Sequence, residues 1–273
     1  MITKEELQRK AAQAGVRVQL QERDYALGWF LLGLAQEPSL SQGMAFKGGT
    51  ALRKTYFPDY RFSEDLDFTL MESMGMKDLQ PGVESVLRQI KRASGMHMWI
   101  AKWKVKREVV GEEAYQARVA YVGPLGQSTS PPRIRLDLTR YECLVLSPMR
   151  RVVTHSYSDA PSGSRRVLTY RLEEMLAEKL RALLRRCYPR DVYDVWYLLR
   201  YYGERLEHRD LLQALEAKCH YKAYTFSSPE DFLRPTRRAG MPDAWNSSLK
   251  HLVSSVPSYE SVVNDLQDLL GWL

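Results

Sequence analysis

Two carboxylates and a pair of glycines stand out between residues 46 and 70, where the sequence reads FKGGTALRKTYFPDYRFSEDLDFTL. Asp65 and Asp67 are one residue apart in an alternating segment, so on a β-strand they project from the same face. Carboxylates placed this way repel each other unless a cation lies between them. Mg²⁺, or Mn²⁺, binds such oxygen ligands and keeps positions open for substrate phosphates. The pair is a candidate metal site, although an Asp-x-Asp also occurs on ordinary solvated strands.

A third carboxylate lies in a later alternating segment, IRLDLT, where Asp137 has apolar neighbours in sequence. If the two segments are adjacent strands of one sheet, Asp137 becomes a third oxygen ligand beside Asp65 and Asp67. An acidic cluster of this kind suits metal-assisted phosphoryl or nucleotidyl transfer, in which metal ions bridge the phosphates and neutralise the developing charge.

A candidate phosphate-binding turn precedes the carboxylates. Glycines let a backbone approach phosphate closely, and the start of the helix that follows offers N–H groups and a positive dipole end. Lysine and arginine beside the turn and one helical turn later add positive charge. A Gly-Gly turn before a helix is usually only a turn, so the prediction rests on the order of the motifs. The residues concerned are Lys47, Gly48, Gly49, Thr50, Arg53 and Lys54.

The elements that must position these residues differ between the two halves of the chain. Hydrophobic spacing predicts helices within residues 1–36, the second of them over 23–37, and a helix over 82–95 that stops at Gly95. Alternation predicts strands over 63–70, 96–110, 114–123 and 134–142, with the second and third joined through Gly111. Amphipathic helices are predicted over 169–187, 189–203, 206–220 and 257–273.

This layout predicts an α+β protein: a small mixed sheet with flanking helices, followed by an all-helical C-terminal domain. We place the boundary between residues 164 and 165. With 273 residues, 44% hydrophobic and 27% charged, the composition is that of an ordinary globular protein.

Composition also limits the classes of function. No apolar run reaches the roughly 18 residues needed to span a bilayer, and the charged start MITKEELQRK is no secretory signal. Three widely spaced cysteines form neither a disulfide framework nor a metal-ligand pattern, which favours a reducing, cytoplasmic location. The net charge of +7 attracts polyanions such as nucleic acid, although many slightly basic proteins bind none.

The motifs as a set resemble one family. KGGTALRK, RFSEDLDF, LAEKLRALL and RDVYDVWYLL are similar to the AbiEii/AbiGii toxins, including the MenT-type toxins, within the DNA polymerase β-like nucleotidyltransferase superfamily. The resemblance implies a toxin with a separately encoded antitoxin. It also implies a metal-dependent enzyme that transfers NMP from NTP to an RNA, some members acting on the 3′ end of tRNA, and so blocks translation.

The resemblance assigns roles residue by residue. The glycine motif would hold the phosphates of the nucleotide. Ser63 would belong to the Ser-x-Asp-x-Asp motif, whose two aspartates bind metal. Lys179 would contact the triphosphate. Asp191 and Asp194 match an Arg-Asp-x-x-Asp motif, and the match leaves open which of them points into the site. The C-terminal domain would thereby complete the active site. A lone lysine on a helix is ordinarily solvated, and an aspartate in the first turn of a helix can simply meet its dipole or pair with Arg186 or Arg190.

A lysine stripe offers a binding surface for the acceptor. If 96–110 is a regular strand, Lys102, Lys104 and Lys106 share one face and Trp103 lies on the other. Lysines in such a row can bind phosphates, while Trp99 and Trp103 can stack on unpaired bases. A solvated sheet face has the same pattern.

Two other functions remain open from sequence alone. One keeps the chemistry and changes the acceptor to a protein or a small molecule. The other is a non-catalytic binding module on the same fold, although a binding role has no need of the carboxylate pair.

Overall fold

The computed structural model describes residues 1–71, 74–107 and 113–273, apart from the side chains of residues 106, 107 and 113. The chain divides into two compact units. The first contains residues 1–142 and 148–169, and the second contains residues 143–147 and 170–273. The sequence predictions for Gly111 and for the side chain of Lys106 lie outside the described residues.

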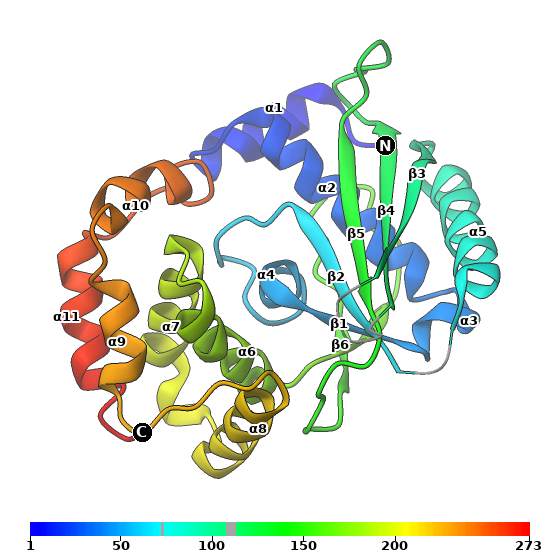
Figure 1. The fold of residues 1–273 in the computed structure, drawn as a ribbon. Helices are drawn as coiled ribbons and strands as arrows, with labels where there is room; N and C mark the ends of the chain where they lie inside the picture. The colour runs from blue at the N-terminus through cyan, green and yellow to red at the C-terminus, as the bar shows by residue number, and fades with distance from the viewer. Residues whose placement is uncertain (72–73, 108–112) are drawn as a thin grey trace. The chain divides into compact units, whose positions relative to one another are not determined.

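A seven-stranded mixed sheet organises the first unit (Figure 1). The strand order is β3-β4-β5-β2-β1-β7-β6, with β2 parallel to β5, β1 parallel to β7 and the remaining pairs antiparallel. The predicted α+β class with a mixed sheet is confirmed. The strands are β1 (Met44–Lys47), β2 (Asp65–Leu70), β3 (His97–Arg107), β4 (Glu113–Val122), β5 (Arg133–Thr139), β6 (Met149–Val152) and β7 (Arg166–Thr169).

Alternation along the central strands separates the core from a polar face. On β2, Leu66 and Phe68 are fully buried, while Asp65 and Asp67 are partly exposed. The predicted strand alternation is therefore confirmed. The strands β6 and β7 were not apparent from sequence because each is only four residues long, too short to establish a period.

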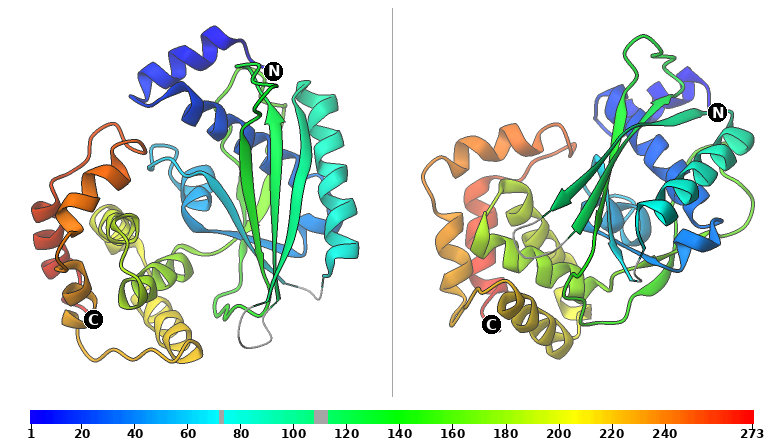
Figure 2. Two further views of the ribbon diagram at one scale, coloured as in Figure 1. Left: turned by 45° about the horizontal axis from the view of Figure 1, so that its top comes forward. Right: turned by 45° about the vertical axis from the view of Figure 1, so that its right-hand side comes forward.

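The helices of the first unit lie on or beside this sheet. They are α1 (Lys4–Gln13), α2 (Val18–Leu34), α3 (Pro38–Ser41), α4 (Gly48–Ala51), the π-helix η1 (Leu52–Tyr56) and α5 (Met76–Ser94). Helices α2 and α5 pack against each other and cover one face of the β3–β5 part of the sheet (Figure 2). The apolar side of α5, including Val83, Val86 and Ile90, is buried there.

Helix α2 begins at Val18, five residues before the start predicted from hydrophobic spacing. Its first turns are polar yet buried, because their side chains form hydrogen bonds and ion pairs with other segments of the chain. The Glu22 carboxylate accepts a hydrogen bond from the backbone N–H of Leu125 at 2.7 Å, and Asp24 binds cations of η1. Burial raises the pKa of Glu22, and the Leu125 hydrogen bond opposes this rise. A period based on apolar residues alone therefore misses the helix start.

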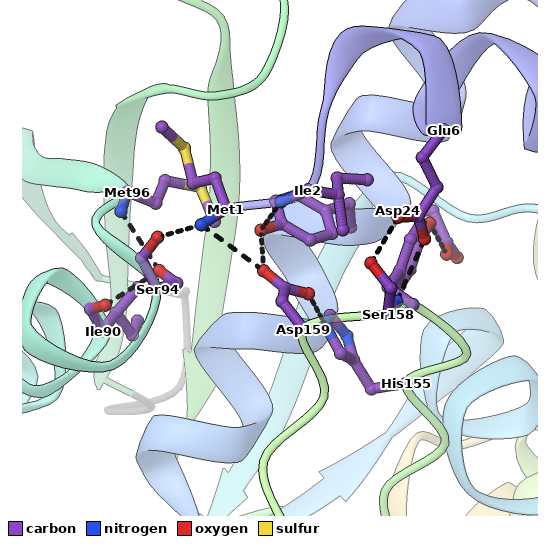
Figure 3. A network of polar contacts seen from close by, with 12 residues as sticks. Met1, Ile2, Glu6, Asp24, Ile90, Ser94, Met96, His155, Ser158 and Asp159 are labelled. Carbon is purple, nitrogen blue, oxygen red and sulfur yellow. Dashed lines mark hydrogen bonds and ion pairs between the residues drawn. The ribbon is translucent and has the colours of Figure 1, made fainter.

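A buried polar network joins α1 and α2 to the segment that follows β6 (Figure 3). The Tyr25 hydroxyl donates to Asp159 at 2.6 Å, and His155 Nε2 lies 3.8 Å from the same carboxylate. The imidazole packs on Gly28, where a Cβ atom would lie 2.3 Å from Nδ1. Burial lowers the pKa of His155, with Asp159 opposing the shift.

The second unit is helical. All four helices predicted for it are present, and two shorter proline-containing helices, α9 and α10, add to them. The bounds are α6 (Leu172–Arg185), α7 (Pro189–Tyr202), η2 (Gly203–Arg205), α8 (His208–Tyr221), α9 (Glu230–Thr236), α10 (Met241–Leu249) and α11 (Tyr259–Leu269). Among the described residues, no helix is both long and apolar enough to cross a membrane.

Residues 143–147 join the second unit through one buried carboxylate. Glu174 accepts hydrogen bonds from the backbone N–H groups of Val145 and Leu146 at 3.2 and 2.9 Å. Lys218 balances its charge with Nζ 2.6 Å from Glu174 Oε1, and donates to the Cys143 carbonyl at 2.7 Å. This pairing satisfies charged groups that would be costly to bury alone.

Candidate active site

The glycine turn and the acidic strand meet in the first unit. Gly48 has φ +80°, a conformation that L side chains rarely adopt, and a Cβ atom there would lie 2.6 Å from Asp67 Oδ2. Lys47, just before it, is paired in register with Asp67 across β1 and β2. Both the backbone conformation and the close approach therefore require glycine at position 48.

The next two residues of the turn contact the Ser-x-Asp-x-Asp segment. A Cβ atom on Gly49 would lie 3.1 Å from Ser63 Oγ. The Thr50 hydroxyl donates to the backbone carbonyl of Asp65, which ties the start of α4 to the start of β2. Gly48, Gly49, Thr50, Ser63, Asp65 and Asp67 are thus brought together, although they were chosen from two separate motifs.

Asp137 lies beside Asp67. Strands β2 and β5 are parallel neighbours with Asp67 opposite Asp137, so the two side chains share a face of the sheet. Gln116 of β4 donates to Asp137 Oδ1 at 2.6 Å. Arg135 bridges two of the carboxylates: its NH2 lies 2.5 Å from Asp65 Oδ2 and its Nε lies 2.7 Å from Asp137 Oδ2. The acidic face already attracts a cation from its own chain.

The donor chemistry of this face fits a hard divalent cation. Asp65 and Asp67 supply carboxylate oxygens from one strand face and both are partly exposed. Within the described part of the chain, no group of three or more His, Cys, Asp or Glu side chains is arranged to hold a metal. Mg²⁺ commonly uses only one or two carboxylates together with substrate phosphates, so the pair is sufficient for that mode.

The cations predicted to line the phosphate turn bind carboxylates of the protein. Lys47 Nζ lies 2.7 Å from Glu142 Oε2. Arg53 Nε and Lys54 Nζ lie 2.9 and 2.7 Å from the two oxygens of Asp24. Burial would raise the pKa of Asp24, but Lys54 and Arg53 hold it well below its usual value. The observed contacts of Arg53 and Lys54 anchor η1 to α2.

A second charged cluster lies within the helical unit. Lys179 of α6 points to α7, with Nζ 2.8 Å from Asp194 Oδ2 and 3.4 Å from Asp191 Oδ1. The three-residue spacing of the aspartates places both on the same face of α7. Arg186 makes a bidentate contact with Asp191 at 2.9 and 3.1 Å. Lys179 thus binds both aspartates that the sequence left as alternatives, and the Arg186 pairing considered for them is also present.

Sequence reasoning missed Arg135, Gln116, Asp24 and Glu142. Arg135 carried a usable signal, because it lies two residues before Asp137 and must share its face on a strand. Gln116 and Asp24 reach their partners only through strand pairing and helix packing, and Glu142 reaches Lys47 from the loop after β5. No spacing in the sequence identifies them.

Comparison with known proteins points to one family. The family model described as "Nucleotidyl transferase AbiEii toxin, Type IV TA system" matches residues 29–270. No curated protein matches the sequence at a significant level.

Solved structures share the fold. MenT4, a nucleotidyltransferase toxin from Mycobacterium tuberculosis H37Rv, aligns over 100% of this chain and 91% of its own, with a TM-score of 0.68 and 19% identity. JHP933 from Helicobacter pylori aligns over 93% of this chain and 91% of its own, with a TM-score of 0.55 and 20% identity. A putative nucleotidyltransferase from H. pylori covers 92% and 93%, with a TM-score of 0.56 and 20% identity.

Proposed function

The chain belongs to the AbiEii family of nucleotidyltransferase toxins of type IV toxin–antitoxin systems, and on this premise we propose that it transfers NMP from an NTP to the 3′ hydroxyl of a tRNA, which blocks translation. The family implies an antitoxin as partner. The observation that best supports the proposal is the contact between the Gly48 backbone and the Asp67 carboxylate. A turn suited to phosphate and a strand suited to metal are neighbours there. A tRNA substrate would make the cytoplasm the place of action.

The proposed roles in the first unit follow from these contacts. Gly48, Gly49 and Thr50 bind the triphosphate through backbone N–H groups at the start of α4, and the lack of a Cβ atom on Gly48 lets this turn pack directly against Asp67. Ser63, next to Gly49, donates to the same phosphates. Lys47 and Arg53 lie beside this turn and are proposed to position it through their ion pairs with Glu142 and Asp24.

Asp65 and Asp67 would hold Mg²⁺ or Mn²⁺, with Asp137 supporting them from the neighbouring strand. A bound metal would supply positive charge to neutralise the phosphates during transfer. Asp65 and Asp67 would fix the position of the cation, and the cation's position would in turn orient the phosphates of the nucleotide. The positive charge of Arg135 balances the negative charges of Asp65 and Asp137.

Lys179 of the second unit is proposed to contact the triphosphate. Asp194, fully buried, and Asp191 hold the ammonium group in place. In this role the two aspartates are positioning residues, because they act through the lysine.

Labelling a cell lysate tests the function and its acceptor together. The protein is incubated with each of the four α-labelled NTPs and Mg²⁺, and label is followed into RNA, protein and small solutes. We expect label in RNA of tRNA size. Label in protein or small solutes would contradict the acceptor, and no label in any fraction with folded protein would contradict the transferase.

Isothermal titration separates the enzyme from a binding module on the same fold. A transferase that uses Asp65 and Asp67 for metal should bind NTP more tightly with Mg²⁺ than with EDTA. Equal affinity under both conditions would contradict the metal assignment.

A further inference from the structure

The face of β3–β5 opposite α2 and α5 carries a row of exposed cations that starts at the acidic site. Cross-strand register pairs Asp65 with Arg135, Arg135 with Arg118, and Arg118 with Lys102. Directly paired residues project from the same face of a sheet, so the four side chains form one row across four strands. With strands about 4.8 Å apart, the row extends about 14 Å from Asp65 to Lys102.

A second row runs beside the first. It contains Asp67, Asp137, Gln116 and Lys104, again paired strand by strand. Both rows therefore change from acidic at β2 to basic at β3.

A bulge in β3 brings an aromatic ring to this same face. The register between β3 and β4 shifts between Ile100 and Lys102. Regular alternation would place Trp99 with Trp103, on the side opposite Lys102. With the extra residue Ala101, Trp99 instead pairs with Ala120, which in turn pairs with the exposed Arg133.

We call Trp99, Lys102, Lys104, Arg118 and Arg133 the basic face. Its four cations are exposed, and Trp99 is half-buried. None of these cations makes an ion pair with another residue in the described ranges. Exposed cations without a structural partner are available to an anionic ligand.

We propose that the basic face binds a single-stranded segment of the acceptor RNA and leads its 3′ end toward Asp65 and Asp67. Cations in rows suit a phosphodiester backbone, and a ring such as Trp99 suits stacking on an unpaired base. The combination favours a single strand, because base pairs would hide the faces that stack. This inference rests on the proposed function and adds where the acceptor binds.

A pair of charge-matched variants tests the surface. Lys102→Ala/Arg118→Ala removes two cations from the basic face. The control Lys77→Ala/Arg92→Ala removes two exposed cations from α5, which covers the opposite face of the sheet. Binding of a fluorescein-labelled 12-nucleotide single-stranded RNA is measured by anisotropy over a range of KCl concentrations, without NTP.

Two lost phosphate contacts should make the negative slope of log K against log[KCl] less steep by about 1.4, which corresponds to about 25-fold weaker binding at 0.1 M salt. The control should keep the slope and affinity of the wild type. Equal losses in both variants would mean that only net charge matters and would overturn the proposal. Unchanged affinity in the basic-face variant would also overturn the proposal. An acidic protein partner would then be the remaining candidate for binding this face.

The aromatic part has a separate readout. Trp99→Ala should weaken binding by about 5- to 150-fold without changing the salt slope, the effect of losing one base–aromatic stack. Trp99→Phe should restore most of the affinity. A blunt RNA duplex of equal charge should bind with no dependence on Trp99. Equal loss for duplex and single strand would overturn the assignment to a single strand.

Transfer assays distinguish failure of this inference from failure of the proposed function. Basic-face variants should lose transfer to a long RNA but keep transfer to a dinucleotide, which is too short to cross the face. If the wild type transfers to neither acceptor yet binds RNA through this face, the function is wrong and the surface stands. If transfer to both acceptors is unaffected in the variants, the surface is wrong and the function stands.

Discussion

At the scale of single residues, Gly48 is where the backbone comes closest to the acidic strand. Its positive φ is one reason for glycine, and the 2.6 Å that would separate an added Cβ atom from Asp67 Oδ2 is another. The first reason concerns stability alone. The second concerns the position of Asp67, which an added Cβ atom would displace and which we propose as a metal ligand.

Replacing Gly48 with alanine separates these two effects. Gly95 is the matched control, because it has φ +76° but no atom within 4 Å of its Cβ position. Alanine at either position should lower the free energy of unfolding by about 1–2 kcal/mol, the cost of a left-handed L-residue. Only Gly48→Ala should lose nucleotidyl transfer, measured as label incorporated into RNA. Equal activity in the two variants would contradict the role of the turn.

At the scale of elements, Asp24 of α2 holds η1 in place behind the glycine turn. Its side chain is buried and binds both Arg53 and Lys54. The cation pair therefore sets how the helix that starts at the turn packs on α2. We infer that this packing keeps the turn against β2.

Asp24→Asn should destabilise the protein by about 3–5 kcal/mol, because Lys54 would stay buried without an opposite charge. Asp59→Asn, at an exposed position in the same unit, should change stability by less than about 0.5 kcal/mol. Urea unfolding followed by circular dichroism measures both. A small effect of Asp24→Asn would show that the anchor is not important for stability.

The buried titratable groups predict how stability depends on pH. Burial lowers the pKa of His155, so the folded state keeps this ring neutral while the unfolded chain takes up a proton below about pH 6.5. Stability should therefore fall as pH decreases through that value toward the lowered pKa. The lowered pKa of Asp24 adds a second loss below about pH 4, where the unfolded carboxyl becomes protonated.

A substitution of His155 tests whether this residue causes the loss of stability below about pH 6.5. His155→Gln should reduce the slope of unfolding free energy against pH between about 7 and 5. His97→Gln replaces an exposed ring and serves as the control. An unchanged slope in His155→Gln would contradict the assignment.

Much of the fold and part of the site were predictable from sequence. The alternation around Asp65 and Asp67 predicted their strand and face, and IRLDLT predicted a second strand with Asp137. That the two strands are neighbours was only a condition of the sequence reasoning, and the structure meets it. The bulge at Ala101 was not predicted, because the apolar residues Trp99 and Ala101 fill the positions where the alternation shifts from Met98 and Ile100 to Trp103 and Val105. The bulge alone decides that Trp99 shares a face with Lys102.

At the scale of the whole molecule, the two units carry different parts of the proposed machinery. The first contains the glycine turn, the carboxylates and the basic face. The second contains Lys179 with its two aspartates, and these charged groups are paired within the unit. We therefore expect transfer, but not the folding of the first unit, to depend on the second.

Substitutions at Lys179 test this dependence. Lys179→Met leaves the fully buried Asp194 without its lysine and should lower the melting temperature. Lys179→Met/Asp194→Asn removes both charges and should recover part of that stability. Both variants should be inactive in the labelling assay. Activity in the stable double variant would show that Lys179 has only a structural role.

The central claim is that Asp65 and Asp67 support transfer of a nucleotide to RNA. Its most direct measurement is the rate at which label from an α-labelled NTP enters the 3′ end of purified tRNA, for the wild type and Asp67→Asn. The amide keeps the size of the side chain beside Gly48 and removes its charge. We predict transfer by the wild type and a loss of at least about 100-fold in the variant, with unfolding stability retained. A stably folded Asp67→Asn protein that transfers at the wild-type rate would contradict the account.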